Sequence, residues 1–343
     1  LTVNGDIDLS PGNRASGITF ENSSSLLLDG NLLTSGGDIT ISDSVQATSV
    51  LSDAIISADS GTISVGNNGA NLHANNVELR ASEINFSGAV TGTGDLQIRA
   101  ETGARNIELG SADSSALNLT NLELGYLNGG FANIIIGTQP DANNFSIHNA
   151  DFSGNSTNIN INANEVTLDG LVVGAGNINI HSASNLNLNG LASNHNQGGD
   201  VVFNVGGVFT NNVGANSIDL GTGRFIIYSP DESSLIANGL SATKVYNANF
   251  EDTPPSVFVD RKDRFIFADK APLPTNIITQ NIRDNISRAN RQAITQIQLQ
   301  NSQEDIKTQK IDNETSTETI QDGSIAKNSS CLVALKNSAG CVL

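Results

Sequence analysis

The chain has 343 residues, of which 35 are acidic and 17 basic, so its formal net charge is −18. This charge argues against nucleic acid or an anionic membrane as the main partner, since both need a basic surface. The sequence contains no Met, no basic and apolar leader and no long apolar run, so we expect neither a signal peptide nor a membrane span. We interpret it as the C-terminal piece of a longer chain.

Positive charge is unevenly distributed along the chain. Only four arginines precede Gly221, against 21 acidic residues, whereas 13 basic and 14 acidic residues follow from that position onward. A change of composition of this kind predicts a domain boundary within residues 221–245.

Residues 1–228 consist of short segments in which apolar and polar residues alternate, such as GDITIS, GTISVG and NIELG, separated by Gly, Asn, Ser and Asp. This alternation is the period of a half-buried β-strand. No helical period interrupts it, so we expect an all-β shaft over residues 1–228.

The segments repeat at intervals of about 20 residues, which is typical of a solenoid. The clearest repeat aligns NININANEVTLDG (158–170) with NINIHSASNLNLNG (177–190). The spacing predicts these stacked pairs: Ile159 with Ile178, Val166 with Leu186, Leu168 with Leu188, Leu79 with Ile98, and Phe86 with Leu109.

A parallel β-helix fits this repeat best. Leucine-rich repeats need a fixed Leu and Asn frame that is absent, and a sandwich or propeller needs more hairpin signals and longer repeats. Asn, Ser and Gly suit the corners of a β-helix, where side chains bond backbone groups or the backbone bends sharply. At about 20 residues per coil, the shaft would contain about 11 coils.

Residues 229–274 are expected to form a C-terminal cap and a Pro-rich linker. The last strong apolar run of the shaft is followed by Pro230, and aromatic residues then mix with charged ones. A cap would cover the open edge of the last coil, which otherwise invites aggregation. Within it, VFVDRKDRFIFA predicts a β-hairpin that turns at Arg261, Lys262 and Asp263.

Residues 275–300 are predicted to form an amphipathic helix, and residues 301–343 a disordered tether with a terminal cysteine loop. In the first segment, steps of three and four place apolar residues on one helical face. The tether is polar and contains no aromatic residue, which is typical of disorder. The apolar face comprises Ile278, Ile282, Ile286, Ala289, Ala293 and Ile297.

No motif predicts catalysis, so we expect no catalytic, cofactor-binding or metal-binding residues and no enzyme activity. His73, His148, His181 and His195 lie at strand or corner positions and lack partners at metal-ligand spacing. Isolated turns such as GTGDL are too few to indicate calcium sites. No ladder of carboxylates is apparent, because Asp169 lies about one coil from an asparagine rather than from another acid.

The only two cysteines, Cys331 and Cys341, lie near the C-terminal end. Their spacing does not fit CxxC redox chemistry, and two ligands alone make a poor zinc site. A disulfide between them would remove about 3 kcal/mol of chain entropy from the unfolded state. Because it lies beyond a tether, it would stabilise the shaft little. Two interpretations remain: a closed knob that acts as a stopper, and a docked or incidental pair.

The sequence resembles the filamentous haemagglutinin-like exoproteins of two-partner secretion, in the branch of high-molecular-weight adhesins. The resemblance rests on coils such as NININANEVTLDG, on the segment GTGRFIIYSPDESSLIANGL with KVYNANF, and on the terminal cysteine pair. At Glu232 the family commonly has proline.

This resemblance implies a bacterial adhesin of virulence or biofilm formation. It would be extracellular and attached to the outer membrane by a disulfide of Cys331 and Cys341, held in an outer-membrane transporter. The missing part or the shaft would bind a glycan or protein on host cells or in a biofilm. Two alternatives stay open: a β-helical carbohydrate-active enzyme, and a released exoprotein or toxin stalk.

Overall fold

The computed structural model describes most of residues 1–271 and part of a C-terminal helix. The chain divides into two compact units, Leu1–Ala271 and Pro272–Leu343. The described residues are 1–11, 16–21, 26–41, 47–50, 53–66, 71–101, 105–112, 115–127, 130–138, 143–154, 157–194, 198–271, 286, 288–289, 291–304 and 307.

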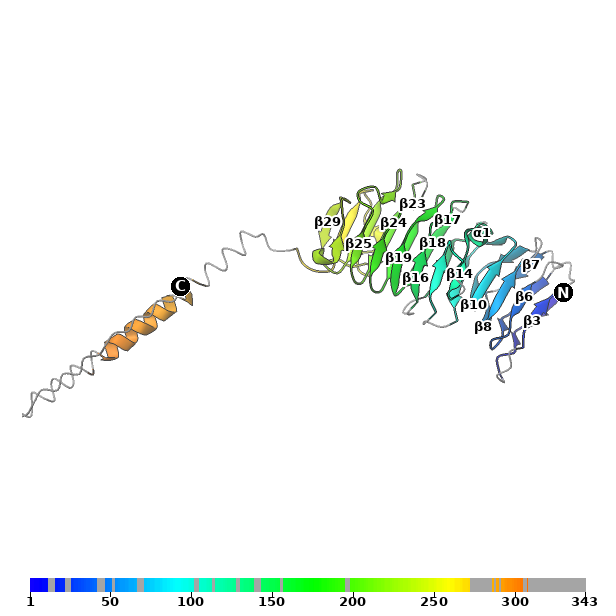
Figure 1. Cartoon of the computed structure of the whole chain (residues 1–343), viewed down its shortest axis with the longest axis horizontal. Coiled ribbons are helices and arrows are strands. Elements are labelled where there is room, and N and C mark those ends of the chain that lie inside the picture. The colour runs from blue at the N-terminus through cyan, green and yellow to red at the C-terminus, as the bar shows by residue number, and fades with distance from the viewer. Residues whose placement is uncertain are drawn as a thin grey trace, which may run out of the picture. The chain divides into compact units, whose positions relative to one another are not determined.

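The unit Leu1–Ala271 is a parallel β-solenoid of about 10 turns (Figure 1), which confirms the predicted all-β parallel β-helix. The alternating sequence produces it directly. In NININA, for example, the Ile and Ala side chains are buried and the Asn side chains are partly exposed. Each strand places alternate side chains on opposite faces, so stacked strands give one apolar inner face and one polar outer face.

The solenoid has three sides, and the first is a continuous sheet along its whole length. In spatial order its strands are β2 (Ile7–Asp8), β5 (Leu32–Leu33), β8 (Ala54–Val65), β10 (Val77–Phe86), β12 (Asp95–Ala100), β15 (Asn133–Ile136), β18 (Asn158–Ala163), β21 (Ile178–Ser182), β24 (Val201–Val205), β27 (Phe225–Ser229), β30 (Arg264–Phe267) and β29 (Thr243–Tyr246).

The second side includes the later halves of β8 and β10, which bend around a corner. Strand β8, for example, pairs with β5 through its first half and with β6 through its second. Its other strands are β3 (Ile18–Phe20), β6 (Ile39–Ile41), β14 (Leu117–Leu119), β13 (Ile107–Leu109), β16 (Asn144–Ile147), β19 (Glu165–Leu168), β22 (Leu186–Leu188), β25 (Phe209–Asn211) and β28 (Leu235–Ile236).

The third side consists of a 5-stranded and a 4-stranded sheet. The short helix α1 (Asn121–Leu124) adjoins the 4-stranded sheet. Thr120 and Glu123 form a capping box at the start of α1. The strands are β1 (Thr2–Asn4), β4 (Leu26–Asp29), β7 (Ala47–Val50), β9 (Asn71–Ala74) and β11 (Val90–Gly92), then β17 (Ala150–Phe152), β20 (Leu171–Val173), β23 (Ala192–Ser193) and β26 (Ile218–Asp219).

The register confirms four of the five predicted stacked pairs, namely Ile159 with Ile178, Val166 with Leu186, Leu168 with Leu188, and Leu79 with Ile98. The pair of Phe86 with Leu109 is wrong. Phe86 pairs with Val65, and Leu109 pairs with Leu119 and Ile147. The reason is an enlarged coil, in which β14 follows β13 in sequence but lies between β13 and the second half of β10.

One hydrophobic cluster fills the interior from Ile18 to Phe267. Most of its members are aliphatic side chains that stack coil upon coil, and phenylalanines fill the remaining positions. Among these, Phe203 and Phe209 stack with 5.9 Å between their ring centroids. Burial of apolar surface contributes about 25 cal/mol per Å², so this cluster supplies most of the stabilisation of the solenoid.

The end of the solenoid continues the same sheets into residues 229–267. After β27, β28 pairs with β25, and β29 forms the outermost strand of the first side. The later strand β30 then lies between β27 and β29 and is parallel to both. The predicted hairpin is therefore wrong: Pro255–Val257 is a 3-10 helix, and residues 264–267 pair with strands that are distant in sequence.

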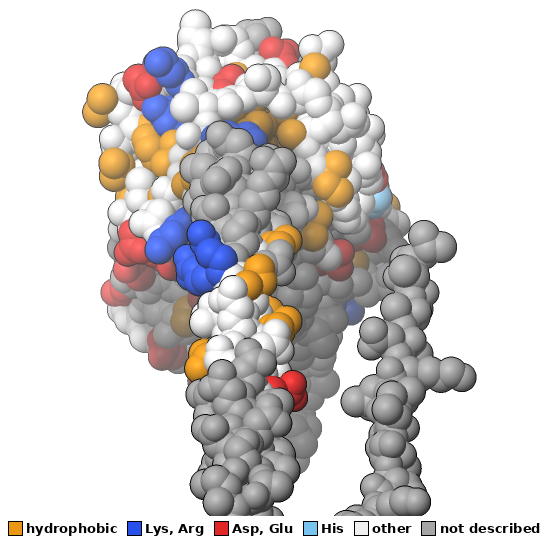
Figure 2. Space-filling view, turned by 90° about the vertical axis from the view of Figure 1, so that its left-hand side faces the viewer, with side chains coloured by type: hydrophobic (Ala, Val, Ile, Leu, Met, Phe, Trp, Pro, Cys, Tyr) orange, Lys and Arg blue, Asp and Glu red, His pale blue; other side chains and the backbone are white. Residues whose placement is uncertain are grey.

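Residues 247–263, here called the end loop, fold back over the outer face of the first side. A second hydrophobic cluster lies beneath this loop and contains Val202, Ile226, Tyr228, Ala248 and Ile266, with Val245 and Phe258 packed against it. Figure 2 faces this end of the solenoid, where exposed apolar side chains lie in small separate groups among polar and charged ones. The end loop thus covers apolar surface that the last strands direct outward.

In the second unit, residues 291–304 are helical and exposed. The helix continues to residue 304, beyond its predicted end at residue 300. In this extension the Ser302 hydroxyl donates to the backbone carbonyl of Gln298 at 2.8 Å. Ile286 and Ile297 of the predicted apolar face are 56% exposed. The residues predicted as the start of this helix, and those of the tether after 307, lie outside the described residues. In the part of the chain that the structure describes, no helix is long and apolar enough to cross a membrane.

Candidate functional site

The outer face of the first side changes character along the solenoid. Outward positions on β10 and β12 carry charged residues, including Glu78, Arg80 and Arg99, and the same rows carry neutral amides on β18 and β21. The apolar interior varies little along the solenoid, so these outward side chains are where a ligand would meet a variable surface. Two grooves lined by described residues lie on this face.

A ladder of Asn and Asp side chains runs along the corner at which the strands of the first side begin. The Asn76 amide donates to Asp53 at 2.8 Å, and its oxygen accepts from the backbone N–H of Asp95 at 2.7 Å. Such side chains satisfy backbone groups that a corner leaves unpaired, which explains the abundance of Asn beside the strands. The ladder comprises Asp53, Asn76, Asp95, Asn133, Asn158, Asn177 and Asp200.

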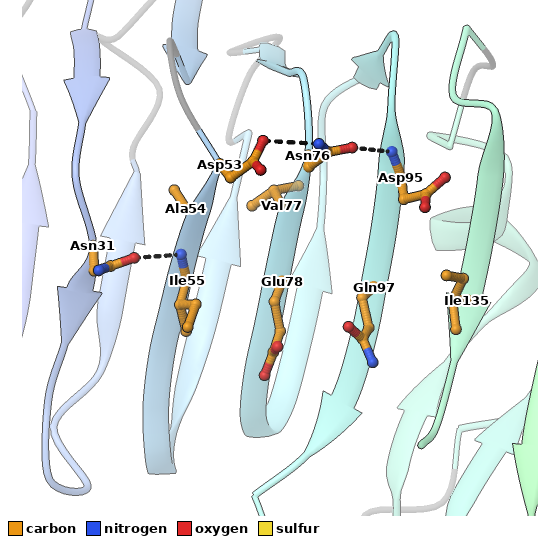
Figure 3. Close-up of a pocket in the computed structure, with 10 residues that line it drawn as sticks. All are labelled: Asn31, Asp53, Ala54, Ile55, Asn76, Val77, Glu78, Asp95, Gln97 and Ile135. Atoms are coloured by element: carbon orange, nitrogen blue, oxygen red, sulfur yellow. Dashed lines mark hydrogen bonds between the residues drawn. The ribbon is translucent and has the colours of Figure 1, made fainter. Parts of the chain in front are cut away.

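The first groove, here called the acidic groove, lies over β8, β10 and β12 and has a volume of about 570 Å³ (Figure 3). Three carboxylates contribute to its lining. Figure 3 shows Asp53 and Asp95 on either side of Asn76, with Glu78 and Gln97 further along the same strands. The lining residues are Asn31, Asp53, Ala54, Ile55, Asn76, Val77, Glu78, Asp95, Gln97 and Ile135.

Each carboxylate of the acidic groove already has a partner. Asp53 accepts from Asn76, Asp95 accepts from the Asn133 amide at 2.8 Å, and Glu78 accepts from Arg99 at 3.2 Å. The sequence predicts no ladder of carboxylates, and none forms in this groove; instead Asn76 joins Asp53 and Asp95 within it. That arrangement allows acid–base chemistry or hydrogen bonding to a polar ligand.

The second groove, here called the amide groove, has a volume of about 380 Å³ and lies over β18, β21 and β24, beside the end loop. Its floor consists of outward amide and imidazole side chains, and its wall comes from the end loop. The lining residues are Asn160, Ile161, Asn162, Asn179, Ile180, His181, Val202, Asn204, Phe250, Pro255 and Ser256. None of them is an acid, a lysine or an arginine.

Hydrogen bonds between neighbouring strands hold the floor of the amide groove. The Asn179 amide donates to the Asn160 oxygen at 2.8 Å, and the Asn204 amide lies 2.7 Å from His181 Nδ1. Burial lowers the pKa of His181, and nearby Glu251 opposes that change. The imidazole is therefore neutral at pH 7, and with Asn204 as the donor its Nδ1 accepts.

Arg224 holds the wall of the amide groove in place. Its guanidinium is buried, and it donates to Asp200 at 2.9 Å and to the carbonyls of Pro255, Phe258 and Asp260 at 2.9, 2.6 and 2.8 Å. One side chain thus ties the end loop to the corner ladder. Arginine suits this role because its planar group presents five donors in fixed directions.

Aromatic contacts orient the same wall. The Tyr228 hydroxyl donates to the Thr253 carbonyl at 2.7 Å, and its ring meets Phe250 edge to face, with 5.3 Å between the centroids. Phe250 is 36% exposed. The wall therefore presents part of a fixed aromatic ring to solvent at the margin of the amide floor.

The described histidines do not form one site. His73 lies 3.1 Å from the Thr91 hydroxyl, His148 lies 2.9 Å from Asp169, and His181 is in the amide groove. His195, Cys331 and Cys341 lie outside the described residues. In the described ranges, no three His, Cys, Asp or Glu side chains are grouped so that they would hold a metal ion.

Glu83 is a half-buried acid that the sequence analysis did not single out. It lies on β10 against the inserted strand β14, where it accepts from the Asn118 amide at 3.0 Å. Burial raises the pKa of Glu83 to about 7, and Glu123 adds to the effect while Arg105 opposes it. The alternating pattern did not indicate this burial, because an outward Glu is usually exposed to solvent. Here the neighbouring strand β14 places Asn118 against Glu83.

Comparison with models of known families, with curated proteins and with solved structures finds no match to this chain.

Proposed function

We propose that the chain is the C-terminal segment of a bacterial cell-surface adhesin secreted by a two-partner system. In this proposal the solenoid projects from the cell. The tail passes toward an outer-membrane transporter, and a disulfide between Cys331 and Cys341 retains the protein there. The ligand is a glycan or protein of a host cell or biofilm.

One observation carries this proposal: a rod-like stack of coils is closed at its C-terminal end by strands β27 to β30 and the end loop, and a polar tail with the only two cysteines follows. A solenoid displays outward side chains along an extended surface, which suits adhesion. A disulfide so far along the chain from the solenoid has little effect on its stability, which favours an anchoring role.

The test is retention on the cell. In the bacterium that produces the protein, Cys331→Ser and Cys341→Ser should each move most of the protein from the cells to the medium. Ser338→Ala, which alters the same stretch without removing a thiol, is the matched control. Unchanged retention of both cysteine variants would contradict the proposed anchoring role of the disulfide.

Mass mapping of the tail provides a second readout. Cleavage after Lys336 of the full chain under non-reducing conditions should leave the peptides of Cys331 and Cys341 joined. Separate peptides with free thiols would show that the loop is open, and the proposal would then lose its means of retention.

A second candidate function, a β-helical carbohydrate-active enzyme, is favoured by the three carboxylates of the acidic groove. Asp53 and Asp95 are two strand spacings apart, or about 10 Å, near the separation of about 6.5 to 9.5 Å used by inverting glycosidases. Release of reducing sugar from neutral or acidic polysaccharides by the full chain, abolished in Asp53→Asn and in Asp95→Asn, would establish this function. No release would favour the adhesin.

A further inference from the structure

The amide groove contains hydrogen-bonding groups that the fold does not use. The Asn162 side chain has no partner among the described residues. The side-chain oxygens of Asn179 and Asn204 likewise accept no hydrogen bond there, although their amide groups are held by neighbouring strands. Donors and acceptors on fixed strands are preorganised, which lowers the entropy lost when a ligand binds.

The lining of the amide groove disfavours negatively charged ligands. No lysine or arginine is available to pair with an anionic ligand, and the His181 imidazole is neutral at pH 7 because burial lowers its pKa. Glu251, in the end loop beside Phe250, adds negative potential at the margin. A carboxylate or phosphate would therefore lose hydration without gaining an ion pair.

The groove also offers an apolar contact next to the amides. Phe250 is partly exposed, and Tyr228 fixes its orientation. Sugar rings combine hydroxyl groups at their edges with C–H groups on their faces, so they match a surface with amides on the floor and an aromatic wall. The volume of about 380 Å³ falls within the range of small-ligand sites.

We propose that the amide groove binds a neutral oligosaccharide of about two sugar units. Three strands at a spacing of about 4.8 Å span about 10 Å, which accommodates that length. Asn162, Asn179 and Asn204 bond the hydroxyl groups, and Phe250 packs against a ring face. The inference rests on the adhesin function proposed above, for which it names the class of ligand and the place where it binds.

A peptide strand fits this site less well. Strand addition requires free backbone N–H and C=O groups at a sheet edge. The backbone of β18, β21 and β24 is instead already paired on both sides within the ladder. Only side chains are available here, which favours a ligand with many hydroxyl groups.

The experiment titrates the purified full chain with two matched sets of oligosaccharides. One set contains neutral di- and trisaccharides of hexose and N-acetylhexosamine units, and the other contains uronic or sialic acid in place of one neutral unit. Saturation-transfer NMR detects weak binding, and calorimetry measures the affinity. We expect binding of at least one neutral oligosaccharide, and weaker or no binding of its acidic counterpart.

Variants locate the site. Asn162→Ala removes an amide that makes no bond within the described fold, and Phe250→Ala removes the aromatic contact; each should weaken binding about tenfold, or about 1.4 kcal/mol. Gln97→Ala makes the same kind of truncation in the acidic groove and should leave the affinity unchanged. Circular dichroism confirms that each variant is folded, and Asn162→Ala keeps the test valid if Phe250→Ala disturbs the end loop.

Three outcomes would overturn the inference: no binding of any neutral oligosaccharide, preferential binding of the acidic set, or neutral binding that Asn162→Ala leaves intact. Retention on the cell depends on the tail and is not read by this assay. Unchanged retention of the cysteine variants would therefore count against the anchor alone, whereas absent glycan binding would count against this inference alone.

Discussion

The acidic groove and the amide groove lie on the same sheet, over strands of the same parallel register, yet they offer opposite chemistry. At the row that contains Glu78 and Gln97 in one groove, Asn160 and Asn179 stand in the other. This difference shows that the inward residues determine the β-helical fold, whereas the outward residues can vary and so determine which ligand the surface binds. In a β-helix, half of each strand is therefore available for recognition.

The grooves also differ in how they are walled. The acidic groove is bounded by residues of the strands and their corners, whereas the amide groove has a wall from the end loop, which is distant in sequence. A wall of this kind needs an attachment, and Arg224 supplies it. The amide groove should therefore be the more easily disrupted by a single substitution.

The largest effect is expected for Arg224→Ala. It removes a buried guanidinium and leaves three carbonyls of the end loop without a donor, which should lower the free energy of unfolding by about 3 to 5 kcal/mol. The amide groove should lose its wall and its ligand, while the acidic groove keeps its shape. Denaturant unfolding and limited proteolysis within residues 247–263 measure the two effects.

Arg261→Ala is the matched control, because Arg261 contacts the same carboxylate of Asp200 at 3.1 Å but its side chain is 57% exposed. An exposed pair of this kind contributes about 0 to 1 kcal/mol. Equal losses in the two variants would contradict the assignment of Arg224 as the attachment of the end loop.

An intermediate effect is expected for Asn76→Ala. It removes the donor to Asp53 and the acceptor for the backbone of Asp95, so the free energy of unfolding should fall by about 2 kcal/mol. The acidic groove should be disturbed and the amide groove should not. Thermal unfolding with Gln97→Ala as the control checks the first point, and unchanged oligosaccharide binding checks the second.

The smallest effect concerns pH. Because the pKa of Glu83 rises from 4.5 to about 7 on folding, the folded state favours its protonated form. The stabilisation is complete below pH 4.5 and is lost as the pH rises toward 7 and above. Since the carboxylate is only half buried, we expect about 1 kcal/mol after solvent screening.

Glu83→Gln should remove this dependence. Hydrogen exchange at pH 5 and pH 8, corrected for intrinsic rates, should show that β10 and β14 open more readily at the higher pH in the original chain and equally in the variant. Strands β15 and β18, which carry no titratable side chain, should not respond. The same response in both regions would show that another group is responsible.

Much of the solenoid could be predicted from the sequence because its information is local. Alternation in NININA and NINIHS fixes which side chains face inward, and the repeat of about 20 residues fixes the register. The outward asparagines of the amide groove were visible in the same segments. The wall was not, because FEDTPPS gives no sign of which coil it covers.

The two departures from the predicted order have a shared cause. β14 and β30 each carry an apolar pattern typical of any strand, yet each lies between strands that precede it in the chain. Sequence proximity favours pairing with the preceding coil, so a pattern alone does not reveal an insertion. The predicted hairpin failed for this reason: Arg264–Phe267 pairs with β27 and β29 rather than with the residues just before it.

The position of β30 sets an order of assembly. Among the described strands of the first side, β29 pairs only with β30. Seventeen residues separate the end of β29 at Tyr246 from the start of β30 at Arg264. A chain that emerges from its N-terminal end can add most earlier coils in sequence order, but β29 has no strand partner in this sheet until residues 264–267 are present. The last two strands of the first side, β30 and β29, can therefore join the sheet only together, after the chain has been completed through residue 267.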